Sequence, residues 1–137
     1  MLLKSVATFV YPADKVDLSD TLTFIELPAF ERAWNRLGMT DDDLFALQVA
    51  IMSSPEGGKV IRGTGGLRKV RFRSEASDAG KSGGVRACYV YYSKWGAVLL
   101  VTAYGKSQKS DLTAAQRRDI AKYLEEVESD LSSRTWS

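Results

Sequence analysis

A short run of alternating basic residues offers the clearest chemistry in this sequence. Residues 67–73 read Leu-Arg-Lys-Val-Arg-Phe-Arg. Alternate side chains of a β-strand share a face, so Lys69, Arg71 and Arg73 would lie together while Arg68 points to the other face. Neighbouring like charges repel each other, and guanidinium groups match phosphate oxygens in pairs. The pattern favours a phosphate-binding strip, and the solvent-facing side of a half-buried strand is the alternative.

A second basic segment, rich in tyrosine, follows a glycine-containing loop. Residues 85–93 read Val-Arg-Ala-Cys-Tyr-Val-Tyr-Tyr-Ser, a composition typical of a strand. Alternation groups Arg86 with Cys88 and Tyr92 on one face. Tyrosines beside arginines on a sheet can stack RNA bases and bind phosphates, although strand propensity and core packing explain the tyrosines equally well. We interpret Cys88 as a buried small hydrophobic residue.

Further basic residues flank these two segments. Tyr104-Gly105-Lys106-Ser107-Gln108-Lys109 follows a third apolar run, and Lys81 lies in the loop before residue 85. We therefore predict one site for a polyanion. Its candidate catalytic residues are Lys69, Arg71, Arg86 and Lys106, and its candidate RNA-binding residues are Arg68, Arg73, Lys81, Tyr92, Tyr104 and Lys109.

Missing residue types exclude several kinds of chemistry. The chain has no histidine and one cysteine, which rules out Ser-His-Asp and Cys-His catalysis and a His- or Cys-rich metal site. The run Gly63-Thr64-Gly65-Gly66 could cradle a phosphate, but it lacks the Gly-Lys-Ser/Thr of a P-loop at the required spacing. We interpret Asp41–Asp43 as a helix cap. We expect no metal and no cofactor.

Charge is segregated along the chain. The 137 residues include 19 basic and 17 acidic side chains, for a net charge of +2. Residues 59–109 carry +9, whereas residues 1–58 carry −5 and residues 110–137 carry −2. A basic centre between acidic flanks is typical of a domain with a polyanionic partner, and a solvated basic surface is the alternative.

The elements that must position these residues follow from hydrophobic periodicity and caps. Strands are expected at residues 21–27, 67–73, 85–93 and 97–104, with short extended pieces at residues 60–61 and, as an edge strand, at residues 3–10. The last three long strands suggest an antiparallel meander. A helix over residues 28–37 and a second one after Thr40 form an αα-hairpin. A capping box, Thr113-x-x-Gln116, begins a C-terminal helix.

Composition indicates an ordinary globular chain, with 45% hydrophobic and 26% charged residues. No apolar run reaches the roughly 18 residues that span a bilayer, and the N-terminus shows no clear signal-peptide cleavage site. The single cysteine fits a reducing compartment. We expect one cytoplasmic α+β domain over residues 21–137, preceded by an extension over residues 1–20.

Three segments together resemble the HigB branch of the RelE/ParE toxin superfamily. The first is Val60-Ile61-Arg62-Gly63-Thr64-Gly65-Gly66-Leu67-Arg68-Lys69-Val70-Arg71. The second is Gly80-Lys81-Ser82-Gly83-Gly84-Val85-Arg86 with Tyr89, Tyr91 and Tyr92, and the third is Tyr104-Gly105-Lys106-Ser107-Gln108-Lys109-Ser110-Asp111-Leu112-Thr113. Their order and spacing are similar to that family over roughly residues 21–130.

The resemblance implies a RelE-like fold, in which an N-terminal αα-hairpin packs on a curved, mainly antiparallel sheet with a C-terminal helix. It also implies the toxin of a type II toxin–antitoxin system, which enters the ribosomal A site and cuts mRNA without a metal. The implied partners are the ribosome with its mRNA, a cognate helix-turn-helix antitoxin of HigA type, and operator DNA through that antitoxin. No membrane partner is implied.

The family pattern places basic residues at Lys69, Arg71, Arg86 and Lys106. RelE-like members often carry an arginine where this chain has Ser107 and a tyrosine near Thr113. In the mechanism that we expect, a ribose 2′-hydroxyl attacks the adjacent phosphate, Arg71 and Arg86 stabilise the phosphate, and Lys69 is the base. Lys106 or Tyr104 is then the acid.

Two other functions remain open at this point. A ParE-like inhibitor would keep the fold and bind a protein such as DNA gyrase without catalysis. A plain RNA- or DNA-binding module would bind free nucleic acid in a salt-sensitive way without cutting it.

Overall fold

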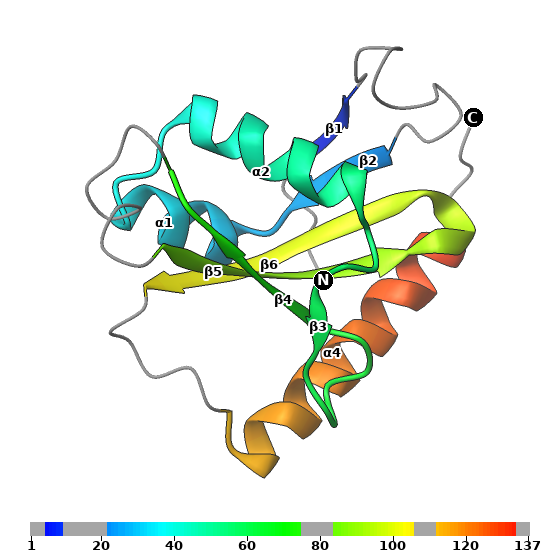
Figure 1. Ribbon diagram of the computed structural model, residues 1–137. Helices are drawn as coiled ribbons and strands as arrows, with labels where there is room; N and C mark the ends of the chain where they lie inside the picture. The colour runs from blue at the N-terminus through cyan, green and yellow to red at the C-terminus, as the bar shows by residue number, and fades with distance from the viewer. Residues whose placement is uncertain (1–4, 10–21, 75–83, 106–111, 134–137) are drawn as a thin grey trace.

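The computed structural model describes residues 5–9, 22–74, 84–105 and 112–133, which form three layers (Figure 1). Helices α1 and α2 cover one face of a six-stranded sheet, and α4 covers the other. The helices are α1 (Pro28–Arg36), α2 (Asp41–Ser53) and α4 (Ala114–Ser132). The strands are β1 (Ser5–Phe9), β2 (Leu22–Glu26), β3 (Lys59–Val60), β4 (Arg68–Phe72), β5 (Val85–Tyr92) and β6 (Ala97–Gly105).

The sheet is mixed and mainly antiparallel. Its strand order is β1-β2-β6-β5-β4-β3. Strands β4, β5 and β6 form the expected antiparallel meander, and β2 lies parallel to β6. A parallel pair needs a long crossover connection, and the chain between β2 and β6 holds α1, α2 and the other meander strands. The meander strands therefore occupy the half of the sheet that carries the basic segments.

One hydrophobic core lies between the sheet and the two N-terminal helices. Phe30 and Trp34 of α1 stack with ring centroids 5.3 Å apart, and Trp34 lies 5.7 Å from the ring of Phe72 at the end of β4. Leu47 and Ile51 of α2 are buried in the same cluster. This packing orients β4, because Phe72 faces α1 and its neighbour in sequence must then face the opposite side of the sheet.

A second core lies between the sheet and α4. The buried stripe of α4 consists of Leu124, Val127 and Leu131, at helical spacing. It packs with Ile25 of β2 and Leu99 of β6. The C-terminal half of α4 is thereby fixed to the sheet beside β2 and β6, while its first turns extend toward the β3–β4 region (Figure 1).

Capping boxes begin both longer helices, as the sequence predicted. Thr113 and Gln116 exchange side-chain and backbone hydrogen bonds at α4. Thr40 and Asp43 do so at α2, with N–O distances of 2.9 and 3.1 Å. Asp43 also accepts a hydrogen bond of 2.5 Å from the hydroxyl of Ser74, just beyond β4. The interpretation of Asp41–Asp43 as a cap is confirmed, and Asp43 additionally joins α2 to the end of β4.

Tyr89 belongs to the core and not to an exposed stacking surface. Its side chain is 1% exposed. Its hydroxyl donates to the carbonyl of Pro55 at 2.9 Å and accepts from the N–H of Gly58 at 3.1 Å. A Cβ on Gly58 would lie 2.7 Å from that hydroxyl oxygen. The buried tyrosine therefore holds the segment that follows α2 against the sheet.

Replacing Tyr89 with phenylalanine is expected to lower the free energy of unfolding by about 1–3 kcal/mol, because the amide of Gly58 loses a buried partner. Urea unfolding followed by circular dichroism measures this change. Tyr91→Phe is the matched control on the same strand face, where the ring is half-buried. Equal stability of the Tyr89 variant and the wild type would contradict a structural role for the hydroxyl.

The structure confirms the α+β class and the C-terminal helix, and its sheet is mixed. Helices begin at Pro28 and Asp41, as expected, and part of the first 20 residues, Ser5–Phe9, forms the outermost strand beside β2. None of the described helices is long and apolar enough to cross a membrane.

Candidate nucleic-acid interface

Three predicted site residues lie directly opposite one another on adjacent strands. Arg71 of β4 pairs with Arg86 of β5, and Arg86 pairs with Tyr104 of β6. Directly opposed residues have Cβ atoms about 4.5–5.5 Å apart and side chains on the same face of the sheet. We call these three residues the arginine row. The row lies on the face that α4 partly covers, because Cys88, two residues after Arg86, packs in the α4 core.

Two arginines side by side repel each other. Arg71 is exposed and Arg86 is half-buried. An anion bound between them would remove the repulsion and accept hydrogen bonds from both guanidinium groups. The row can therefore bind a phosphate and stabilise negative charge that develops on it.

Lys69 lies one row further along, directly opposite Cys88. Cys88 is 2% exposed, as the interpretation of a buried small residue predicted. Burial raises the pKa of the Cys88 thiol to about 11, and the positive charge of Lys69 partly opposes that shift. The half-buried Lys69 is therefore close enough to the row to act on the same substrate, and the thiol stays protonated.

Gly84 sets where β5 begins relative to β4. Its φ is +80°, and a Cβ would lie 2.7 Å from the carbonyl oxygen of Phe72. The carbonyl oxygen of Gly84 also accepts a weak hydrogen bond from Arg86 Nη1 at 3.4 Å. Glycine at this position allows the close backbone approach that places Arg86 beside Arg71.

Substituting Gly84 with alanine is expected to cost about 2 kcal/mol of stability, from the backbone strain together with the contact with Phe72. Phosphate binding should weaken with it, because the register at Arg86 shifts. Thermal unfolding with and without inorganic phosphate measures both effects. Gly38→Ala is the control, since its φ is +77° with no atom near a Cβ, and it should cost about 1 kcal/mol without weakening phosphate binding.

The structure does not bring every predicted residue to the row. Arg68 points to the opposite face and donates to the carbonyls of Glu56 and Gly58 at 2.9 and 2.8 Å. Tyr92 lies six residues beyond Arg86, about 20 Å along β5 at strand spacing. Its ring packs edge-on against Trp95 at 6.0 Å, and burial, followed by the charge of Glu128, raises its pKa.

The other predicted residues lie further from the arginine row or outside the described residues. Arg73 is exposed just beyond the end of β4. Lys81, Lys106 and Lys109 lie outside the described residues. The arginine row with Lys69 is therefore the part of the predicted site that the structure assembles. Arg68 and Tyr92 have structural surroundings that alternation alone did not reveal, namely a carbonyl pair and an aromatic contact.

The glycine-rich turn of residues 63–66 packs against α4. Thr64 donates to the carbonyl of Ile61 at 2.6 Å and accepts from the N–H of Leu67 at 3.1 Å. Arg117 of α4 donates to the carbonyl of Arg62 at 2.8 Å. The Thr64 hydroxyl and the Arg62 carbonyl form hydrogen bonds inside the fold, so we interpret this turn as a structural contact with α4.

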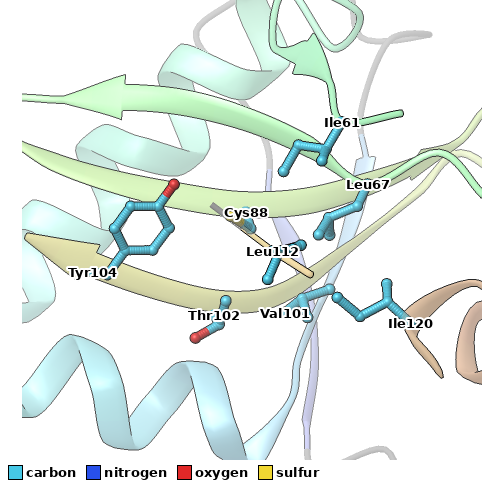
Figure 2. A pocket seen from close by; sticks show the side chains of 8 residues that line it. All are labelled: Ile61, Leu67, Cys88, Val101, Thr102, Tyr104, Leu112 and Ile120. Atoms are coloured by element: carbon cyan, nitrogen blue, oxygen red, sulfur yellow. The ribbon is translucent and has the colours of Figure 1, made fainter. Parts of the chain in front are cut away.

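An apolar pocket of about 110 Å³ adjoins the arginine row (Figure 2). Its apolar walls are Ile61, Leu67, Cys88, Val101, Leu112 and Ile120. Thr102 and Tyr104 complete the lining. Sequence reasoning missed this pocket, because its residues come from segments that are far apart in the sequence and look like ordinary core positions.

A different hollow on the α1 and α2 side of the sheet is acidic. It has a volume of about 300 Å³ and is lined by Glu26, Glu31 and Asp41 together with Trp34, Asn35 and Leu44. No group of three or more potential metal ligands occurs within the described ranges. This acidic hollow and the arginine row therefore lie on opposite faces of the sheet.

No family model matches this chain. The functional assignment therefore depends on the chemistry of the arginine row and on the resemblance of the three sequence segments.

Proposed function

We propose that this chain is the toxin of a type II toxin–antitoxin system, a ribosome-dependent mRNA endonuclease of RelE/HigB type that needs no metal. The observation that carries the proposal is the arginine row, in which Arg71, Arg86 and Tyr104 adjoin Lys69 on one sheet face. The element order also supports it: two helices on one face of a mainly antiparallel sheet, followed by a C-terminal helix.

The reaction divides into three tasks. A ribose 2′-oxygen attacks the neighbouring phosphorus while its proton passes to Lys69, which must first have lost its own proton in order to act as the base. Arg71 and Arg86 stabilise the crowded phosphate, since guanidinium donors pair with its oxygens. The bond to the 5′-oxygen breaks, and that oxygen takes a proton from Tyr104 or from Lys106. The products are a 2′,3′-cyclic phosphate and a 5′-hydroxyl.

Dependence on the ribosome follows from this limited set of groups. The row offers charge stabilisation but no histidine as an acid–base group. Holding the 2′-oxygen in line with the leaving oxygen can supply a large part of the rate. A ribosome that presents the mRNA in this geometry would supply that positioning. A helix-turn-helix antitoxin of HigA type is the proposed neutralising partner, and it would connect the pair to operator DNA.

The test is a cell-free translation reaction with the purified protein, followed by mapping of the 5′ ends of the reporter mRNA. We expect cuts inside the translated frame that disappear when ribosomes are omitted. The cut fragments should carry a 5′-hydroxyl and a cyclic phosphate. Intact mRNA with and without ribosomes would reject nuclease activity.

A ParE-like inhibitor is the second candidate, and the exposed Arg71 would equally suit an acidic protein surface. DNA gyrase supercoiling assays separate this candidate from a nuclease. Salt-sensitive binding to free RNA with no cleavage would instead indicate a plain RNA-binding module.

A further inference from the structure

The apolar pocket and the arginine row share a residue, Tyr104. Its backbone lies opposite Arg86 in the row, and its side chain lines the pocket (Figure 2). Cys88 and Thr102, the next pair along these two strands, also line the pocket. Alternate residues on a strand are about 7 Å apart. A group in the pocket is therefore about one nucleotide's reach from an anion held by the row.

The size of the pocket selects among aromatic groups. Its volume is about 110 Å³, whereas an engineered apolar protein cavity of roughly 150 Å³ binds benzene. The pocket is smaller than that cavity, so one six-membered ring is the most that it can hold, and a fused two-ring system exceeds it. Its walls are mostly aliphatic, and the side-chain oxygens among its lining residues belong to Thr102 and Tyr104. The ring of Tyr104 can stack on a base held there.

We propose that this pocket takes a pyrimidine base of the bound RNA while Arg71 and Arg86 hold the phosphate of the same nucleotide. The proposal rests on the proposed function for the identity of the polyanion. What the proposal adds is a preference for a single-ring base at this subsite. A purine in the same place would exceed the pocket, whose volume is about 110 Å³.

The positive charge beside the pocket favours a nucleotide as its occupant. An apolar side chain of a protein partner would also fill an aliphatic pocket of this size. The partner's backbone, or an acidic residue next to that apolar side chain, would then lie against two adjacent guanidinium groups and Lys69. A nucleotide supplies both the ring and the phosphate in one unit, which satisfies the pocket and the arginine row together.

The test is a nuclear magnetic resonance titration of the full chain with uridine monophosphate, guanosine monophosphate and inorganic phosphate. The reporters are the methyl signals of Ile61, Leu67, Leu112 and Ile120, which line the pocket, and the side-chain Nε signals of Arg71 and Arg86. We expect uridine monophosphate to shift both groups of signals and phosphate to shift the arginines alone. The dissociation constant for guanosine monophosphate should be at least fivefold higher.

The variant Ile120→Phe, which fills the pocket, should abolish the methyl shifts and keep the arginine response. Val60→Phe is the matched control, because Val60 is 45% exposed and is not part of the pocket lining. It should behave like the wild type. The wild-type titration remains decisive if the Ile120 variant does not fold.

The outcomes separate this inference from the function on which it rests. Equal affinity for the two nucleotides, or arginine shifts without methyl shifts, would overturn the base pocket and leave phosphate binding intact. Methyl shifts caused by N-acetylphenylalanine amide but not by uridine monophosphate would overturn it in favour of a protein side chain. Arginine signals that respond to none of the three anions would count against the proposed RNA site itself.

Discussion

Replacing Arg71 or Arg86 with alanine should each reduce ribosome-dependent mRNA cleavage by about 100-fold or more, the usual effect of losing one preorganised donor to a developing negative charge. The free energy of unfolding should instead rise slightly for the Arg71 variant. Since the two arginines lie directly opposite each other on β4 and β5, removing the exposed Arg71 relieves repulsion and should add a few tenths of a kcal/mol. Single-turnover cleavage rates and urea unfolding measure the two effects on the same preparations.

Arg36→Ala is the control for these variants, because Arg36 is an exposed arginine on α1, on the side of the sheet away from the row. It removes one positive charge without touching the site and should retain cleavage within about twofold. If Arg71→Ala and Arg86→Ala cut mRNA as fast as Arg36→Ala, the arginine row is not the catalytic site. If both lose cleavage together with several kcal/mol of stability, their role is structural.

The second large effect is expected at Asp43, which links α2 to the end of β4. Burial acts to raise the pKa of this carboxyl, but hydrogen bonds from Ser74 and Thr40 outweigh it and hold the pKa below its ordinary value of 3.8. A carboxyl with a lowered pKa in the folded state stabilises the protein above the ordinary value. That contribution is lost as the pH falls through the folded-state pKa.

Asp43→Asn is therefore expected to lower the free energy of unfolding by about 2–3 kcal/mol at neutral pH, since charge-assisted hydrogen bonds to the Thr40 amide and the Ser74 hydroxyl are weakened. The difference from the wild type should be full above about pH 5. It should shrink as the pH falls below the ordinary value of 3.8. Urea unfolding measured from pH 2.5 to 7 tests this dependence.

Asp42→Asn is the matched control, because Asp42 lies at the same helix end but is exposed. It should cost a few tenths of a kcal/mol through the helix dipole. A pH-independent difference between wild type and Asp43→Asn would show that the carboxylate charge does not carry the effect.

Local sequence patterns predicted most of the elements, because their signals are short-range. Thr40 with Asp43 and Thr113 with Gln116 form capping boxes at the helix starts where the sequence placed them. Alternation also divided the β4 residues correctly. Phe72 packs in the α1 and α2 core, and Lys69, which alternation puts on the other face, pairs with Cys88 of the α4 core.

The alternation of residues along a strand does not indicate which polar side chains form hydrogen bonds inside the fold. Arg68 and the glycine-rich turn were candidates for binding a phosphate, but Arg68 donates to the carbonyls of Glu56 and Gly58, and the hydroxyl of Thr64 donates to the carbonyl of Ile61. Those partners lie up to 12 residues away along the chain, and hydrogen bonds over such separations leave no periodic signal. The same holds for Arg117, which reaches a carbonyl 55 residues away.

The sequence by itself determined the available chemistry: no histidine, one cysteine and a central segment with a charge of +9. It also determined which side chains of β4 share a face, since that depends on a period of two residues. The tertiary structure alone decided that Arg71, Arg86 and Tyr104 stand in one row beside an apolar pocket. Strand register depends on how the two cores pack and on the close approach at Gly84, and a shift of one residue would have moved every side chain to the opposite face.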